Sequence, residues 1–344
     1  MPSSHAIVGL DANRERLADI GRKGDGDHPP GNVVPGVRGV QLHHARRCRS
    51  IVARRVDVRD AIVHRDQDKM IFRVYPDTEV RLKYQGGQYG ALGLSRGMKR
   101  IDANGELAPE GDILIKRPYS ISSAILDDHN QLLDPNKLSY YEFYVDLVLE
   151  KDIPKPRLSP RLFALNDNDR IFFGSKIVGH YTLQALQKGR NVLFISTTTG
   201  EAPHNSMIHE LLLREERLSI CHIVIGAKEW SSAYQKNHEE LMKNFPGYKF
   251  LAWNDDQTYP RMIQFMEEAL NNQDVAKKNL GWPVNASNTH IYLCGDPRLI
   301  GAPVKLGGWQ YEYPEYGLMR ILQKYQFNPA SRFQPGNISF EAYW

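Results

Sequence analysis

Residues 191–203 read Asn-Val-Leu-Phe-Ile-Ser-Thr-Thr-Thr-Gly-Glu-Ala-Pro. The first six residues form a short, nearly all-apolar run, which is typical of a strand buried in a parallel sheet. Small and hydroxyl-bearing residues follow, before the chain takes up helical spacing, so the stretch predicts a strand–turn–helix unit. Such a turn offers backbone N–H groups to a phosphate at the helix N-terminus. The simpler interpretation is a capped helix start, with Thr199 as the cap and Pro203 near the first turn.

The alternation of strand and helix continues to residue 294. Three further apolar runs, which are strand candidates, lie at 219–225, 248–253 and 289–294. Three stretches with helical spacing lie between them and before the first, at 209–216, 232–244 and 260–271. Strands that alternate with helices predict a parallel sheet with helical crossovers. Ligands of such sheets bind beyond the carboxyl ends of the strands, which makes Cys294 a candidate to face a site. The alternative for Cys294 is a small, buried hydrophobic residue.

The region before residue 183 has a different pattern. Lys69–Tyr75 alternates apolar and polar residues, and Ile113–Ser122 and Tyr140–Leu149 are rich in β-branched and aromatic residues. Many short strands separated by Gly, Pro and Asp turns favour an antiparallel β-barrel. The expected fold is therefore an antiparallel β-barrel followed by an α/β domain with a parallel sheet. We place the barrel at residues 51–182 and the α/β domain at residues 183–344.

Residues 1–50 are expected to form a poorly ordered N-terminal extension, because disorder concentrates at termini. From Gly36 to Arg55 the chain carries six arginines, two histidines and no acidic residue. A basic arm for an acidic partner is the functional alternative for this stretch.

Composition excludes several classes of protein. The chain has 344 residues, with 44 Lys and Arg against 40 Asp and Glu, a net charge of +4 that gives no reason to expect nucleic-acid binding. No apolar run reaches the roughly 18 residues of a membrane span, and no secretory signal is apparent. The three cysteines, Cys48, Cys221 and Cys294, are too few for a four-cysteine iron–sulfur site, and no metal is expected. We therefore expect a cytoplasmic enzyme with reduced thiols. A monomeric state is expected as well.

The segment Arg117-Pro-Tyr-Ser-Ile-Ser122 carries side chains suited to a ligand. Arg117 is a permanent cation whose forked donors match phosphate. Tyr119 lies on the same strand face, because side chains alternate, and its ring can stack on a flat aromatic group. Ser120 can donate or accept a hydrogen bond at the edge of such a group. An ordinary edge strand is the alternative.

Five segments in a fixed order resemble the ferredoxin–NADP(+) reductase family, and most of all its bacterial flavodoxin/ferredoxin reductases. They are Arg-Pro-Tyr-Ser at 117–120, Leu-Ser-Pro-Arg-Leu at 158–162, Thr-x-Thr-Gly-x-Ala-Pro at 197–203, Cys-Gly-Asp-Pro at 294–297 and Glu-x-Tyr-Trp at 341–344. The resemblance covers residues 51–344 and leaves residues 1–50 outside.

The resemblance implies an FAD site on the barrel. Arg117 would bind the pyrophosphate, Tyr119 would stack on the isoalloxazine ring, and Ser120 would bond near flavin N5, where hydride arrives. The other FAD contacts that the family implies are Pro118, Tyr144, Val145, Ser159, Thr199 and Trp344. In this arrangement Trp344, in a C-terminal tail, covers the second face of the flavin.

The resemblance also implies an NADP site at the edge of the parallel sheet. Its implied contacts are Thr199, Gly200, Lys228, Arg261, Cys294 and Gly295. The two cations are the candidates for binding a 2′-phosphate, with a solvated helix face as their alternative. The implied catalytic residues are Ser120, Cys294, Glu341 and Trp344, and the family associates its C-terminal glutamate with proton handling and ferredoxin coupling.

Three departures from the family pattern bear on the nucleotide. Thr198 replaces a glycine, and if that position needs a positive φ its Cβ costs about 1–2 kcal/mol. Glu201 replaces an apolar residue; a carboxylate suits a helix N-terminus but would repel a bound pyrophosphate. A Ser-Arg-like pair near Trp253 is missing, so NAD is a possible cofactor beside NADP.

The function implied is an FAD-dependent oxidoreductase that moves electrons between NADP(H) and a one-electron carrier, ferredoxin or flavodoxin, by hydride transfer at flavin N5. One alternative keeps the fold and is an NADH-preferring flavin reductase, or diaphorase. A second alternative is a flavin-binding electron-transfer subunit with a weakened nucleotide site.

Overall fold

The computed structural model describes residues 51–52, 62–76, 82–101, 113–149, 158–167, 169–214, 218–228, 230–254, 258–307, 310–330 and 335–342. The expectations for residues 1–50 and for Trp344 lie outside these ranges. Residues 303–314 belong to a compact unit separate from the remainder of the described chain. In that unit β12 (Val304–Gly307) pairs antiparallel with β13 (Gln310–Glu312).

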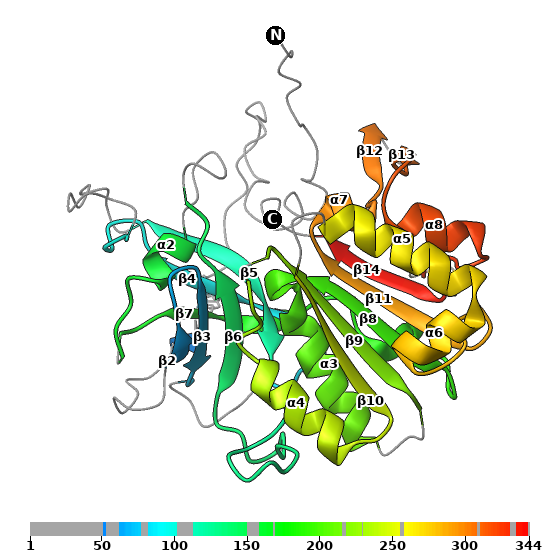
Figure 1. Cartoon of the computed structure of the whole chain (residues 1–344). Helices are drawn as coiled ribbons and strands as arrows, with labels where there is room; N and C mark the ends of the chain where they lie inside the picture. The colour runs from blue at the N-terminus through cyan, green and yellow to red at the C-terminus, as the bar shows by residue number, and fades with distance from the viewer. Residues whose placement is uncertain are drawn as a thin grey trace, which may run out of the picture. The chain divides into compact units, whose positions relative to one another are not determined.

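The first half of the described chain forms an antiparallel sheet of seven strands (Figure 1). Its order is β1-β7-β4-β5-β6-β3-β2. The strands are β1 (Ile51–Val52), β2 (Ile62–Arg65), β3 (Lys69–Val74), β4 (Tyr89–Ser95), β5 (Leu114–Ser122), β6 (Tyr141–Asp146) and β7 (Phe172–Val178). β5 pairs with β4 over most of its length, and its last two residues pair with β6. This change of partner turns the sheet in the way the predicted barrel requires.

Aromatic side chains fill the interior of this sheet. Tyr141 and Phe173 lie with ring centroids 4.8 Å apart, and Phe143 meets Phe173 edge-on at 6.1 Å. All three are buried, as is Ile121 near the end of β5. Burying side chains of this size stabilises a fold by about 1.5–3 kcal/mol each. β5 and β6 therefore provide a rigid support for the residues that they carry.

The second half is a parallel sheet of five strands in the order β10-β9-β8-β11-β14. The strands are β8 (Asn191–Thr197), β9 (Ile220–Gly226), β10 (Tyr248–Asn254), β11 (Thr289–Gly295) and β14 (Ile338–Ala342). Every residue of β9 and β11 is buried, which explains why these strands read as continuous apolar runs. The chain leaves β8 in one direction and returns at β11 on its other side. Between β8 and β11 lies the topological switch point, where ligands of such sheets bind. The predicted fold class is confirmed.

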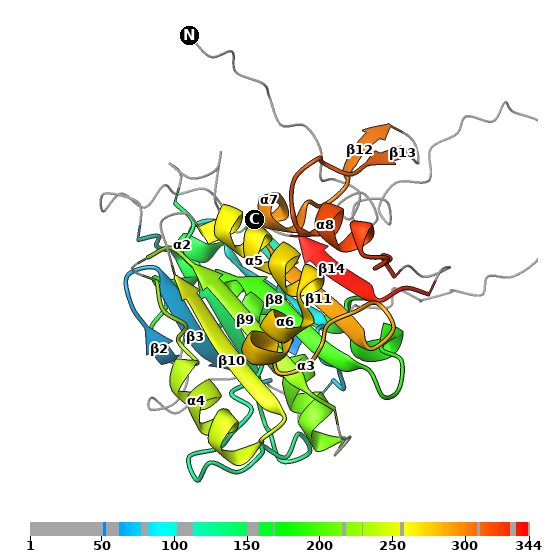
Figure 2. The same cartoon turned by 45° about the vertical axis from the view of Figure 1, so that its right-hand side comes forward.

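Helices follow most of these strands, and Figure 2 shows α5 and α6 crossing in front of the parallel sheet. The helices are α2 (Ser159–Leu162), α3 (Glu201–Leu213), α4 (Gln235–Asn244), α5 (Thr258–Asn271), α6 (Gln273–Leu280), α7 (Pro297–Ile300) and α8 (Leu318–Lys324). Helix α3 begins eight residues before the predicted pattern at 209–216. Its first nine residues are all buried and include polar ones, so the apolar spacing that marks an amphipathic helix is missing there.

Helix α3 also packs on the barrel, at the glycine turn before β4. The backbone N–H of Gly87 donates to Ser206 Oγ at 2.9 Å, and that of Gly86 donates to Glu210 Oε2 at 2.8 Å. A Cβ on Gly86 would lie 2.7 Å from the Ser206 carbonyl oxygen. Only a glycine therefore permits this close approach. The barrel and the parallel sheet meet across α3.

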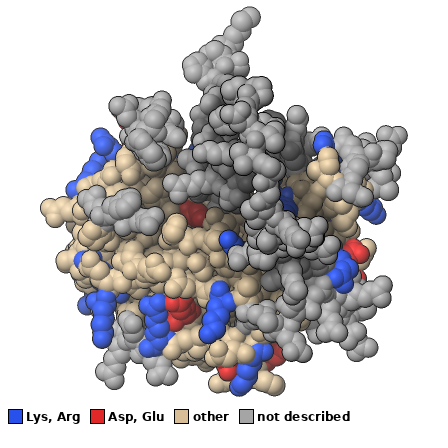
Figure 3. Space-filling view, turned by 180° about the vertical axis from the view of Figure 1, so that it is seen from behind, with Lys and Arg blue, Asp and Glu red and all other residues tan. Residues whose placement is uncertain are grey.

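Charged side chains of both signs are interspersed on the face shown in Figure 3. This distribution agrees with the small net charge of +4. Among the described helices, none combines the length and the apolar character that a membrane crossing needs.

Candidate functional site

The carboxyl ends of β8 and β11 touch each other at the switch point. After β8 the chain makes a 3₁₀ turn at Thr198–Gly200 and enters α3 directly. A Cβ on Gly200 would lie 2.5 Å from the carbonyl oxygen of Cys294. Gly295 has φ +119°, and a Cβ there would lie 2.1 Å from Thr197 Oγ1. The structure thus brings together Gly200, Cys294 and Gly295, as the sequence predicts, and both glycines are required sterically.

Thr198 adopts a left-handed backbone with φ 41°. The strain expected for a side chain in place of the family's glycine is therefore present, and it is uncommon for a β-branched residue. The hydroxyls of Thr198 and Thr199 both donate to Asp146 Oδ2, at 2.9 and 2.8 Å. The Thr199 hydroxyl is thus engaged with the barrel, and the residue at the N-cap of α3 is Gly200.

Asp146, the last residue of β6, is the partner that sequence analysis did not anticipate. Burial raises the pKa of its carboxyl to about 6, although the hydrogen bonds from the two threonines act in the opposite direction. In the sequence, a single acid after an aromatic strand indicates only where the strand ends. The tertiary fold brings Asp146 to the turn that lies 52 residues later in the chain. Charge-assisted bonds of this kind are among the strong hydrogen bonds of proteins.

β5 presents the residues that the sequence analysis assigned to a flavin. Arg117, Tyr119 and Ser120 are partly exposed, Pro118 is exposed, and Ile121 is buried. The Arg117 guanidinium donates to the Lys116 carbonyl at 2.7 Å. Tyr119 packs on the barrel core, and burial raises the pKa of its phenol.

The other implied flavin contacts from the barrel are buried. Tyr144 and Val145 lie in the interior on β6, and the Tyr144 ring meets Tyr234 edge-on at 5.4 Å. The Ser159 hydroxyl accepts from the backbone N–H of Val148 at 3.0 Å. Ser159 therefore also serves to join α2 to the segment after β6. The roles of these three residues toward a flavin stay predictions.

Glu341 on β14 links the two halves of the site. It stands opposite Cys294 in the register of β14 and β11. Burial raises the pKa of its carboxyl to about 7. Burial, and to a smaller extent the charge of Glu341, raises the pKa of Tyr89, which pairs with Ser120 across β4 and β5. Cys294 and Glu341 thus lie side by side on neighbouring strands, whereas Trp344 lies outside the described residues.

Lys228 and Arg261, the candidates for a 2′-phosphate, are both exposed. Lys228 follows β9 and Arg261 lies in α5 after β10, and these two strands are parallel neighbours. Both cations therefore lie on the carboxyl side of the sheet. At the same edge the Asn254 side chain donates to the Trp230 carbonyl oxygen. The role of the two cations toward a phosphate stays a prediction.

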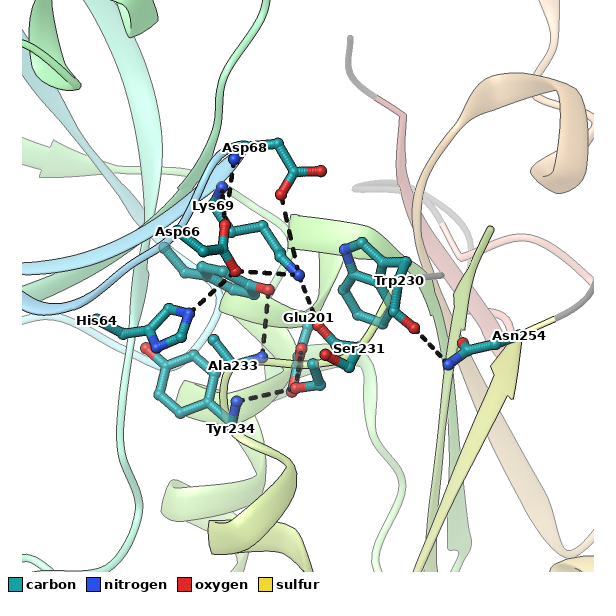
Figure 4. A network of polar contacts seen from close by, with 12 residues as sticks. His64, Asp66, Asp68, Lys69, Glu201, Trp230, Ser231, Ala233, Tyr234 and Asn254 are labelled. Atoms are coloured by element: carbon teal, nitrogen blue, oxygen red, sulfur yellow. Dashed lines mark hydrogen bonds and ion pairs between the residues drawn. The ribbon is translucent and has the colours of Figure 1, made fainter. Parts of the chain in front are cut away.

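Glu201 is fully buried in a polar network between α3 and α4 (Figure 4). The Ser232 hydroxyl lies 2.7 and 2.8 Å from its two carboxylate oxygens, and His238 Nε2 lies 2.7 Å from Oε1. Tyr248 in turn places its hydroxyl 2.8 Å from His238 Nδ1. The carboxylate that was expected to repel a pyrophosphate is thus bound by interior partners.

The segment after β9 also reaches the barrel, as Figure 4 shows. The Lys69 ammonium donates to the Ser231 carbonyl at 3.0 Å, and the Tyr234 hydroxyl donates to Glu142 Oε1 at 2.9 Å. Glu142 is buried on β6 and accepts from Arg73 Nε at 3.0 Å. Within the described parts of the chain, no group of three or more His, Cys, Asp or Glu residues is arranged to hold a metal ion.

Comparisons with known proteins agree with this geometry. Residues 194–305 match the family described as the oxidoreductase NAD-binding domain. The flavodoxin/ferredoxin–NADP reductase of Escherichia coli is 26% identical over 162 residues, which cover 46% of this chain and 62% of that reductase. The corresponding reductase of Buchnera aphidicola from Schizaphis graminum is 24% identical over 196 residues, covering 55% of this chain and 68% of its own. Over these stretches the chain is similar to the flavodoxin/ferredoxin–NADP reductases.

Solved structures of ferredoxin–NADP reductases share the fold. The enzyme from Neisseria gonorrhoeae, solved with bound FAD and NADP, has a TM-score of 0.54 at 15% identity and covers 80% of this chain and 92% of its own. A mutant of the Plasmodium falciparum ferredoxin–NADP reductase, solved with 2′P-AMP, has a TM-score of 0.54 at 17% identity and covers 86% of this chain and 96% of its own. At these identities the structural likeness establishes the fold of this chain and leaves its residue roles to be tested.

Proposed function

We propose that the chain is an FAD-dependent reductase that transfers electrons between NADP(H) and ferredoxin or flavodoxin. The observation that carries the proposal is the position of β5 beside the switch point of the parallel sheet. The end of β5 pairs with β6, and Asp146 at the end of β6 accepts hydrogen bonds from Thr198 and Thr199 of the turn after β8. Glu341 stands opposite Cys294 at the end of β11. A flavin on β5 and a nicotinamide at the switch point would therefore be neighbours.

The residues at the switch point fit a dinucleotide. Side chains on Gly200 and Gly295 would collide with backbone or with Thr197, so the ends of β8 and β11 pack closely against each other there. The N-terminal end of α3 carries the partial positive charge of the helix dipole, which favours an anion. The N–H of Glu201 itself donates to the carbonyl groups of Thr198 and Thr199. Lys228 and Arg261 add positive charge on the same side of the sheet.

The residues on β5 fit FAD. Arg117 offers a guanidinium for the pyrophosphate, and the phenol ring of Tyr119 is supported from behind by the barrel core. FAD, when bound, supplies the hydride and one-electron chemistry. Ser120 then orients the edge of the ring, and Cys294 and Gly295 position the nicotinamide. Glu341, with a pKa of about 7, can hold or release a proton at neutral pH.

The first experiment is a visible absorption spectrum of the purified protein under anaerobic conditions, followed by titration with NADPH and NADH. A yellow protein that NADPH bleaches, and that then reduces ferredoxin or flavodoxin, supports the proposal. A colourless protein that cannot be reconstituted with FAD contradicts it. Arg117→Ala should lower FAD retention, whereas the control Lys116→Ala, which removes the neighbouring exposed cation, should not.

The second candidate function is an NADH-preferring flavin reductase. The strained Thr198 and the engaged Asn254 side chain favour it, since both alter the part of the sheet edge that would receive NADP. Lys228→Ala discriminates the two, because removing a 2′-phosphate partner raises the KM for NADPH and leaves that for NADH nearly unchanged. An equal rise in the KM for NADPH and for NADH would show that Lys228 does not bind the 2′-phosphate. A cytoplasmic location and a monomeric state stay predictions.

A further inference from the structure

Asp146 joins the barrel to the turn at the switch point through one oxygen atom. Two threonine hydroxyls from consecutive residues donate to Oδ2, at 2.9 Å from Thr198 and 2.8 Å from Thr199. The barrel side of this contact is rigid, because Asp146 ends β6 and pairs with Lys69 of β3. The turn side is strained, because Thr198 has φ 41°.

The two hydrogen bonds to Asp146 explain how Thr198 keeps its left-handed backbone. A threonine has no preference for the left-handed region, and a turn built from Thr-Thr-Thr-Gly would relax unless something held it. Charge-assisted bonds from both hydroxyls to a carboxylate on a fixed strand supply that hold. The Lys69 ammonium is directed elsewhere, toward Ser231 O and Asp66, so it does not take the place of the threonines as the partner of Asp146 Oδ2.

We propose that Asp146 is a positioning residue for the nicotinamide dinucleotide: it accepts both threonine hydroxyls and fixes the Thr198–Gly200 turn in the conformation that presents its backbone to the pyrophosphate. This inference rests on the proposed function, because it assigns the turn to the dinucleotide. Asp146 itself stands behind the turn and contacts the ligand only through it. The two residues on which it acts are Thr198 and Thr199.

The test is a pair of variants that separate the effect of the hydrogen bonds to Asp146 from the effect of the strained backbone at Thr198. Asp146→Ala should raise the KM for NADPH about tenfold, the loss expected when a charge-assisted bond no longer holds the site, with kcat and bound FAD nearly unchanged. Adding Thr198→Gly to Asp146→Ala should bring the KM for NADPH most of the way back to that of the unmodified protein, since glycine adopts a positive φ freely. The matched control is Asp68→Ala, which removes a neighbouring acid whose side chain is 66% exposed. It should leave the KM unchanged.

Several outcomes overturn the inference. If the KM is unaltered in Asp146→Ala, Asp146 does not act through the turn. The same conclusion follows if the KM rises in Asp146→Ala and stays high when Thr198→Gly is added. If Asp146→Ala does not fold, Asp146→Asn replaces it, because its amide oxygen still accepts while the charge is lost. A smaller rise in KM is then expected.

Failure of the proposed function is recognised separately. It appears in the unmodified protein, as absence of flavin or of reduction by either nucleotide. The coupling between Asp146 and Thr198 can still be measured in that case, by urea unfolding of Asp146→Ala, Thr198→Gly and the double variant. Additive losses of stability mean that Asp146 and Thr198 are uncoupled, and the inference is wrong; a coupling between them supports it.

Discussion

At position 200 the backbone turns from β8 into α3 within van der Waals contact of β11. The backbone φ of Gly200 is −57°, which any residue can adopt, so the requirement for glycine there is one of space alone. Thr198, two residues earlier, presents the opposite case, with space for a side chain and a backbone that disfavours one. The same turn therefore holds two kinds of constraint, and substitutions distinguish them.

Gly200→Ala should destabilise the protein by about 1–3 kcal/mol, the usual cost of overpacking, because its Cβ would lie 2.5 Å from the Cys294 carbonyl oxygen. The displaced turn should also raise the KM for the nucleotide. Urea unfolding and steady-state kinetics measure the two effects. Gly189→Ala is the control, since its φ is +79° and nothing lies within 4 Å of its Cβ. It should cost about 1 kcal/mol with no change in KM. Equal effects of both variants on KM would contradict the steric argument.

At the scale of elements, the starts of strands were predicted more closely than those of helices. β8, β10 and β11 begin at the residues predicted, because a buried parallel strand is an uninterrupted apolar run. The start of α3 was missed because Glu201, His204 and Asn205 are polar and buried, which removes the periodicity. The residues of the switch point were predicted from strand ends, but Asp146 was not, since its partners are defined only by the tertiary fold.

The network between α3 and α4 yields a second prediction. Glu201→Ala leaves the Ser232 hydroxyl and the His238 ring without their buried acceptor. Each unsatisfied buried group costs about 1–3 kcal/mol, so a loss of about 2–6 kcal/mol is expected in urea unfolding for the two groups. Glu240→Ala, which removes a surface ion pair with Lys243, is the control and should cost less than about 1 kcal/mol. Similar losses in the two variants would show that the interior network contributes little.

At the scale of the whole molecule, the interior carries several histidines that are held neutral. Burial lowers the pKa of His204 and of His290 to about 3, and it lowers the pKa of His209 and His222 as well. Neighbouring His238 and His204 lower the pKa of His222 further. In the unfolded chain each histidine binds a proton near pH 6.5. The unfolded state therefore binds more protons at these sites below that pH, and their contribution to stability is present above pH 6.5 and is lost on acidification.

His222→Phe tests this dependence at one site. Both ring nitrogens of His222 are buried, and the ring lies between Phe194 and Phe250 on neighbouring strands, so phenylalanine suits the position. The slope of unfolding free energy against pH should fall by about 1.4 kcal/mol per pH unit between roughly pH 4.5 and 6, the contribution of one proton. Urea unfolding at a series of pH values measures the slope. Parallel slopes for the variant and the unmodified protein would mean that His222 is protonated in the folded state.

The contact between Asp146 and the turn after β8 also bears on how such a protein changes over time. The carboxylate belongs to one half of the chain and the threonines to the other, and 52 residues separate Asp146 from Thr198. Without the acid nothing holds Thr198 at its positive φ, and without the threonines the acid at position 146 loses the two donors to its Oδ2. An exchange of halves with a relative that has glycine in this turn would therefore leave either a turn that nothing holds or an acid with fewer hydrogen-bond donors. We therefore expect the acid at position 146 and the threonines at positions 198 and 199 to change together.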